Sequence, residues 1–153
     1  ARGMVKTILH KRSADGLGLL DALAQAAFTL MATLNTLAAE NDLSLTQLRV
    51  AGILRDRRLR MAELARYLGL EKSTMTGLVD RAEQRGLMAR APNPDDGRAI
   101  DVFLSREGLK LAERIEAQLQ DVMAPLTARL APTDQRQLQQ LLERLLTPPA
   151  EAG

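Results

Sequence analysis

The fold is decided by the stretch Glu71-Lys72-Ser73-Thr74-Met75-Thr76-Gly77-Leu78-Val79-Asp80-Arg81-Ala82-Glu83-Gln84-Arg85-Gly86. Its apolar residues recur at three- and four-residue steps, the spacing of one face of an α-helix. These residues are Met75, Leu78, Val79 and Ala82. Glu71 places negative charge at the start of the helix, where it complements the helix dipole, and Gly86 suits the left-handed conformation that ends a helix. The stretch predicts an amphipathic helix.

The other face of this helix is unusual for a solvated surface. It carries Ser73, Thr74, Thr76, Gly77 and Arg81. Ser, Thr and Gly add little to helix stability, but short polar side chains let a helix approach another surface closely. The DNA major groove is one such surface. An ordinary amphipathic helix with a weak outer face fits equally well, so the neighbouring segments must decide.

Composition places the chain among globular proteins with aliphatic cores. The 153 residues favour one domain, and 46% hydrophobic with only 2% aromatic residues indicates a helix-forming core. The absence of Cys excludes disulfides and thiol nucleophiles and suits a reducing cytoplasm. No signal peptide and no apolar run of membrane-spanning length is expected, so we predict a soluble, cytoplasmic protein with no membrane partner.

Positive charge is concentrated in the middle of the chain. The net charge is only +2, but residues 49–98 hold eleven Lys or Arg against seven Asp or Glu. This distribution fits a central nucleic-acid surface, and a solvated face would also fit an excess of this size.

Two short helices are predicted before the helix of the opening stretch. Ser44 and Gln47 have the spacing of a capping box, which starts a first helix. The run 55–58 is predicted to be a solvated turn. A helix over Met61–Leu68 then ends at Gly69, and a four-residue turn leads into the opening helix. This layout is that of a helix-turn-helix, whose second helix lies in the major groove.

After Gly86 the apolar period changes to two. Residues 87–91 and 99–104 are predicted strands, and the segment 92–98 between them is dense in turn formers. A β-hairpin directly after a helix-turn-helix is a wing. Arg98 at its tip is suited to a narrow minor groove, where the negative potential is enhanced. Asp96 is placed to hold the Arg98 guanidinium by a charge-assisted hydrogen bond.

Long helices are predicted on both sides of this region, over 17–40, 105–126 and 133–146. Their apolar bands are broad, and a two-fold dimer would explain them. The predicted fold is mainly α with a small β-hairpin wing, a winged helix-turn-helix flanked by N- and C-terminal dimerisation helices. The predicted parts are a flexible arm (1–16), a dimerisation region (17–43 and 105–147), a DNA-binding lobe (44–104) and a disordered tail (148–153).

These motifs resemble the MarR (multiple antibiotic resistance regulator) family of winged-helix repressors. The resemblance covers roughly residues 17–146, and its specific part is the combination of Leu78-Val79-Asp80-Arg81 with Pro94-Asp95-Asp96-Gly97-Arg98 at this separation. It implies a homodimer that binds a pseudo-palindromic operator in double-stranded DNA. It also implies release by a small amphipathic or phenolic ligand bound between the dimerisation helices and the DNA-binding lobe.

Carried over by position, the resemblance predicts the DNA-binding residues Lys72, Ser73, Thr74, Thr76, Gly77, Arg81, Asp96 and Arg98. Gly77 departs from the family pattern, in which a larger, often basic residue is common, so one contact to DNA is expected to be absent. Arg60 stands where a Ser or Thr cap is usual. Residues that bind the ligand are not assigned.

Two other classes of function were weighed. An enzyme is disfavoured, because the chain has no Cys, a single histidine at His10, no glycine-rich phosphate loop and no metal-ligand spacing, so no catalytic residue, metal or cofactor is predicted. Asp80 and Glu83 are better explained as a solvated or ion-paired face than as a catalytic carboxylate pair. The remaining alternative is a winged-helix module that binds protein and no operator.

Overall fold

The computed structural model describes residues 17–150. The helices are α2 (Gly18–Glu40), α3 (Leu45–Leu54), α4 (Met61–Leu68), α5 (Lys72–Gln84), α6 (Arg106–Thr127) and α7 (Pro132–Leu146), and the strands are β1 (Leu59–Arg60), β2 (Met88–Pro92) and β3 (Ile100–Leu104). A mainly α chain with a small hairpin was predicted and is confirmed. The predicted flexible N-terminal segment (1–16), with His10, and the last three residues of the predicted tail lie outside the described residues.

The three strands form one antiparallel sheet in the order β1-β3-β2. The hairpin pairs Met88 with Leu104 at its base and Pro92 with Ile100 near its tip. Each strand begins one residue later than predicted. The short strand β1, which pairs Leu59 with Val102, was not predicted because two residues are too few to show a period.

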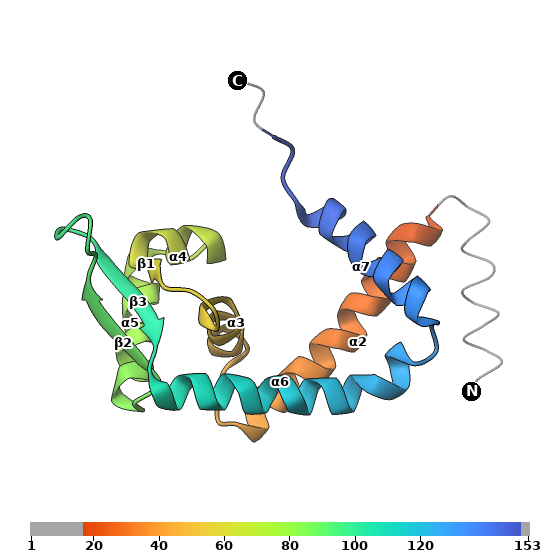
Figure 1. The fold of residues 1–153 in the computed structure, drawn as a ribbon, viewed down its shortest axis with the longest axis horizontal. Helices are drawn as coiled ribbons and strands as arrows, with labels where there is room; N and C mark the ends of the chain where they lie inside the picture. The colour runs from red at the N-terminus through yellow and green to blue at the C-terminus, as the bar shows by residue number, and fades with distance from the viewer. Residues whose placement is uncertain (1–16, 151–153) are drawn as a thin grey trace.

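Helices α3, α4 and α5 pack with the sheet into one lobe (Figure 1). Its core is aliphatic, as the composition predicted, and its fully buried side chains include Leu54, Leu64, Met75, Val79 and Val102. Ser44 and Gln47 form the predicted capping box at the start of α3. Gly69 and Gly86 end α4 and α5 with φ of 66° and 72°, in the left-handed region where glycine is favoured.

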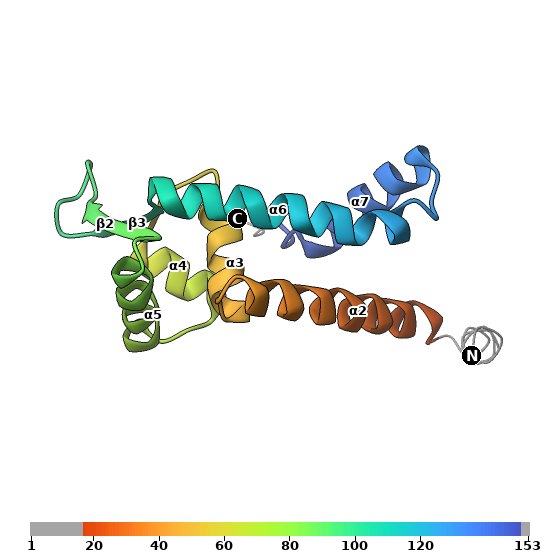
Figure 2. The same ribbon diagram turned by 90° about the horizontal axis from the view of Figure 1, so that it is seen from below.

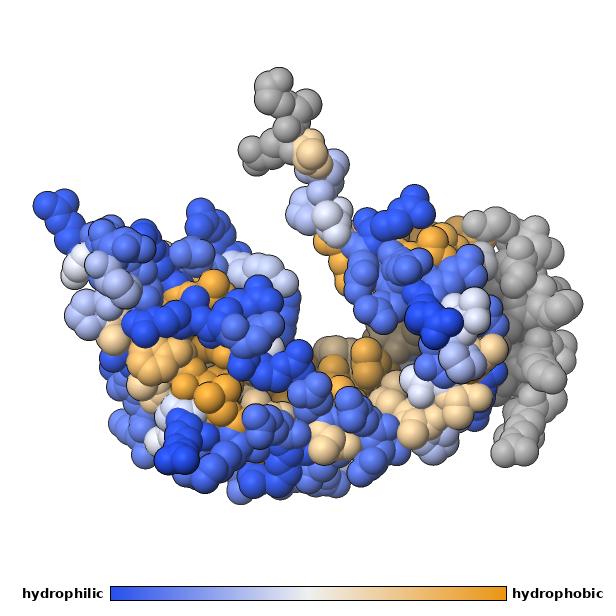
Figure 3. Space-filling model, viewed as in Figure 1, coloured by the Kyte–Doolittle hydropathy of each residue, from blue (hydrophilic) through white to orange (hydrophobic). Residues whose placement is uncertain are grey.

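Helices α2, α6 and α7 form what we call the arm. Figures 1 and 2 show α2 and α6 leaving the lobe in the same direction, with α7 at the far end. The arm has little core of its own, since α7 has no buried residue and α2 has only Leu37 and Ala38. Figure 3 shows apolar side chains gathered in the hollow between the lobe and α7. A single chain therefore exposes a large apolar surface.

The sequence predicted no apolar run long enough to cross a membrane, and this prediction is wrong. Helix α2 is 23 residues long and apolar enough to cross a membrane by length and composition. The sequence reasoning missed this because polar residues such as Gln25 and Thr29 interrupt the apolar run, while few charges do. One such helix is weak support for a membrane span, because helices that pack against other protein pass the same test.

Candidate nucleic-acid interface

Helix α5 buries one face in the lobe and presents the other to solvent. The buried residues are the predicted ones, Met75, Leu78, Val79 and Ala82. Lys72, Ser73, Thr74 and Arg81 are exposed, and Thr76 and Gly77 are half-buried. The Thr76 hydroxyl donates to the Lys72 carbonyl at 2.9 Å, so its oxygen remains able to accept a hydrogen bond.

The opposite flank of α5 is tied to the wing by Arg90. The Arg90 Nη2 atom lies 2.7 Å from Asp80 Oδ1, and Arg90 Nε lies 2.9 Å from Glu83 Oε1. The hydrogen bonds that Arg90 donates to Glu83, followed by the charges of Glu83 and Asp80, raise the pKa of Arg90. The ion-paired interpretation of these two carboxylates is confirmed. Their effect is to fix α5 against β2.

The tip of the hairpin is an ordered turn. The Asn93 Oδ1 atom accepts hydrogen bonds from the backbone N–H groups of Asp95 and Asp96, at 2.9 and 3.0 Å. The Arg98 guanidinium has no hydrogen bond or ion pair within residues 17–150. It therefore projects free from a fixed base.

Asp96 acts differently from what the sequence suggested. Its Oδ1 accepts from the backbone N–H of Arg98 at 3.1 Å, and it does not bind the guanidinium. Its Oδ2 lies 3.9 Å from Arg60 Nη1. Two residues of separation in a tight turn favour the local backbone donor, which lies nearer than the end of a long side chain. Asp96 thus shapes the turn that presents Arg98.

Asp101 was missed as a structural residue of the wing. It is only 3% exposed, although it carries a charge. Its carboxylate accepts from Arg58 Nε at 3.0 Å and from Asn93 Nδ2 at 2.9 Å. The Arg58 guanidinium also lies 4.6 Å from the centre of the Phe103 ring. The available signal was an Asp in mid-strand, where it is depleted.

A basic groove of about 830 Å³ opens between α4, α5 and the wing. Its charged lining residues are Arg60, Arg66, Lys72, Arg90 and Arg98. Of the predicted DNA-binding residues, the groove brings together Lys72, Thr76 and Arg98. Ser73, Thr74, Gly77, Arg81 and Asp96 do not line it. Arg60 starts α4 without a side-chain cap, as its type suggested, and lies 3.8 Å from Glu63.

Comparison with known proteins finds a family that is similar to part of this chain. A family model described as "MarR family" matches residues 41–99, which include the helix-turn-helix and most of the wing. An HTH-type transcriptional repressor of Mycobacterium tuberculosis is 33% identical over 87 residues, covering 57% of this chain and 63% of that protein. The homoprotocatechuate degradative operon repressor of Escherichia coli is 26% identical over 126 residues, covering 82% and 85%.

Solved structures with a similar fold are also found. The crystal structure of NadR in complex with 4-hydroxyphenylacetate has a TM-score of 0.70 at 26% identity, over 81% of this chain and 89% of that one. Over residues 41–99 the chain is similar to the MarR family. The match spans less than two thirds of the mycobacterial repressor's length. The MarR family and these relatives are transcriptional regulators and not enzymes.

Among residues 17–150, two other cavities that lie away from the basic groove have lining residues of interest. One, of about 570 Å³, lies between α2, α3 and α6, with mostly aliphatic walls and three charged side chains, Arg49, Arg55 and Glu116. Arg55 and Glu116 form an ion pair of 2.9 Å there, so the run 55–58 is more than a solvated turn. Within residues 17–150, no group of acidic or histidine side chains suits a metal ion.

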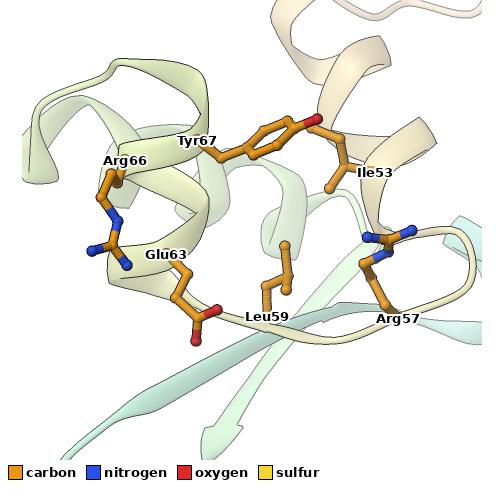
Figure 4. A pocket seen from close by; sticks show the side chains of 6 residues that line it. All are labelled: Ile53, Arg57, Leu59, Glu63, Arg66 and Tyr67. Atoms are coloured by element: carbon orange, nitrogen blue, oxygen red, sulfur yellow. The ribbon is translucent and has the colours of Figure 1, made fainter. Parts of the chain in front are cut away.

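The other cavity, of about 390 Å³, is shown in Figure 4. Tyr67 reaches across it from α4 toward Ile53 of α3, and Leu59 lies on its floor. Tyr67 also stacks with Arg49, whose Cζ is 5.9 Å from the ring centre. This cavity is part of the lobe and holds none of the predicted DNA-binding residues.

Proposed function

We propose that this protein is a MarR-family transcriptional repressor that binds double-stranded DNA sequence-specifically. The observation that carries the proposal is the basic groove beside the exposed polar face of α5. Helix α5 enters the major groove, where Ser73, Thr74 and Arg81 meet base edges. Arg98 extends from the wing toward the adjacent minor groove. Arg66 and Lys72 have no ion pair within residues 17–150, so their charges are available to phosphates.

The second part of the proposal is that the repressor is a homodimer on a pseudo-palindromic operator. The leucines of α7 are exposed, with Leu145 at 61% and Leu141 at 50%, and Phe28 of α2 is 76% exposed. Apolar surface of this extent is normally covered by protein. A second copy related by a two-fold axis covers the same faces of both chains and presents two α5 helices. A second copy also explains why α2 is apolar without placing it in a membrane. This explanation fits a cytoplasmic protein.

The third part concerns release from DNA. The cavity between α2, α3 and α6 has apolar walls with a few charged groups, which suits a small amphipathic or phenolic molecule. The structure of NadR contains such a molecule, 4-hydroxyphenylacetate. A ligand that binds more tightly to a dimer with a different spacing of its α5 helices shifts the population away from DNA binding. The shift cannot exceed the difference between its affinities for the two forms.

The experiment is to select duplexes from a random-sequence pool and measure the stoichiometry by sedimentation. We expect a pseudo-palindromic duplex bound by two chains. Leu145→Glu should give a monomer that binds this duplex weakly, while the matched variant Glu143→Gln on the same helix remains dimeric. The absence of any selected sequence would refute the proposal and favour a protein-binding module.

Release is tested separately with 4-hydroxyphenylacetate as the probe. We expect it to dissociate the complex, and Ala51→Phe, which fills the cavity, to prevent this. If the probe releases the variant and the wild-type protein equally, the cavity is not the ligand site.

A further inference from the structure

The end of α5 is attached to the arm at two points. We call this region the junction and define it as Arg85-Gly86-Leu87 with its contacts. The first attachment is made by a side chain: Arg85 Nη1 donates to the Asp42 carbonyl at 2.5 Å, and Arg85 Nη2 to the Asn41 carbonyl at 3.5 Å. These carbonyls lie at the C-terminal end of α2, where the helix dipole favours a cation.

The second attachment is made by the backbone. The Ser105 hydroxyl, which caps α6, donates to the Gly86 carbonyl at 2.5 Å, and the Ser105 N–H donates to the Leu87 carbonyl at 3.0 Å. At Gly108, an added Cβ would lie 2.0 Å from the Leu87 oxygen. The first turn of α6 is therefore packed directly on the junction, with no space for a larger side chain at Gly108.

The end of α2 is in turn connected to α6. Asn41 Nδ2 donates to Gln118 Oε1 at 3.0 Å and to the Leu37 carbonyl at 2.8 Å. Asp42 next to it has φ of 55°, which non-glycine residues rarely adopt, so contacts around the corner hold its geometry. The ends of α2 and α5 and the body of α6 thus form a closed set of three contacts, of which Arg85 supplies one.

We infer that Arg85 is a positioning residue that fixes the orientation of α5 relative to the arm and thereby sets the spacing of operator half-sites. This inference rests on the proposed function. Within residues 17–150, no other hydrogen bond or ion pair joins α5 to residues 41–44. A charge-assisted bond is directional.

Removing this bond should leave the lobe folded. Leu43, Leu87 and Leu111 pack together beneath the junction, around a void of only about 10 Å³. Such apolar contacts hold the elements together but tolerate small rotations better than a directional bond does. In a dimer, the two α5 helices must enter successive major grooves about 34–36 Å apart, so a rotation of α5 at each junction changes the spacing that fits.

The test uses the duplex that the wild-type protein selects from a random pool, with one or two base pairs inserted or deleted between its half-sites. Each base pair also rotates one half-site around the DNA axis, so the wild-type protein should lose about tenfold or more in affinity per step. Arg85→Met keeps the aliphatic part of the side chain and removes the donors. We expect it to discriminate between the spacings by less than about threefold, with its best affinity lowered.

Two further variants complete the test. Arg114→Met removes the same charge from an exposed position on α6. The Arg114 side chain has no hydrogen bond or ion pair within residues 17–150, so this variant should keep the wild-type discrimination. Arg85→Lys keeps the charge but cannot donate to both carbonyls in a fixed direction, so its discrimination between the spacings should be intermediate. If Arg85→Met does not fold, Arg85→Lys carries the test. If both Arg85 variants discriminate between the spacings as the wild-type protein does, this inference is overturned and the proposed function is not. Failure of the wild-type protein to select any duplex would overturn the proposed function as well.

Discussion

The guanidinium of Arg81 lies directly over Gly77: a Cβ added at Gly77 would be 3.3 Å from Arg81 Nη1. The two residues are one turn apart on the exposed face of α5. Gly77 therefore does not leave an empty position on this face of the helix. The side chain of the next turn covers it, and we expect Arg81 to supply the contact to DNA from there.

Replacement of Gly77 by Ala should separate helix stability from recognition. Alanine in a helix interior stabilises by about 0.5–1 kcal/mol relative to glycine, and the end of the exposed Arg81 side chain can move a few tenths of an ångström. We expect a higher free energy of unfolding and weaker operator binding, measured by denaturant titration and by fluorescence anisotropy. Gly52→Ala is the matched control, because its Cβ meets nothing within 4 Å in α3. It should stabilise equally and leave DNA binding unchanged; equal DNA affinities for both variants would contradict a role for this pair.

Arg98→Ala should lower operator affinity by about 1–3 kcal/mol without lowering stability. The reason is that the Arg98 guanidinium makes no contact within residues 17–150 that the fold needs, while its backbone N–H stays bonded to Asp96. Arg129→Ala removes the same charge from the connection between α6 and α7 and should change affinity much less. Similar losses in the two variants would mean that only net charge matters.

Asp101→Ala should destabilise the wing. Loss of a buried carboxylate that accepts from Arg58 and Asn93 costs about 1.5–3 kcal/mol for a charged hydrogen bond of this kind. Thermal and urea unfolding should both show the change. Asp56→Ala breaks the exposed pair with Arg57 at 3.0 Å and should leave the unfolding free energy unchanged. If Asp101→Ala were as stable as Asp56→Ala, the buried network would contribute nothing.

Gly108→Ala should be strongly destabilising. Its Cβ would lie 2.0 Å from the Leu87 carbonyl oxygen, and neither backbone segment can move without separating α6 from the end of α5. Overpacking of this kind costs at least about 1–3 kcal/mol. Gly97→Ala, where nothing lies within 4 Å, should be nearly neutral. Calorimetric melting of the two variants side by side checks this difference.

The sequence predicted what depends on nearby residues. The apolar spacing of Met75, Leu78 and Val79 predicted the inward face of α5, and Ser44 caps α3 where its type indicated. These signals lie within one or two turns, so a period or a cap suffices to find them.

The sequence did not predict contacts between distant segments. Arg58 binds Asp101, and Arg85 binds the carbonyl of Asp42, each across 43 residues. No period or motif records such a pairing, because it depends on how the helices and strands pack. The same limit explains why the role of Asp101 was not predicted, and why the arrangement of Arg98 over its turn needed the structure.

The most direct test of DNA recognition by this protein is a binding titration with the DNA upstream of its own gene, at two salt concentrations, beside a scrambled duplex. We predict tight binding to the upstream DNA that saturates at two chains per site and weakens steeply with salt, because counterions are released from several phosphates. The scrambled duplex should bind far more weakly. Equal, weak binding to both duplexes, with little dependence on salt, would contradict the account.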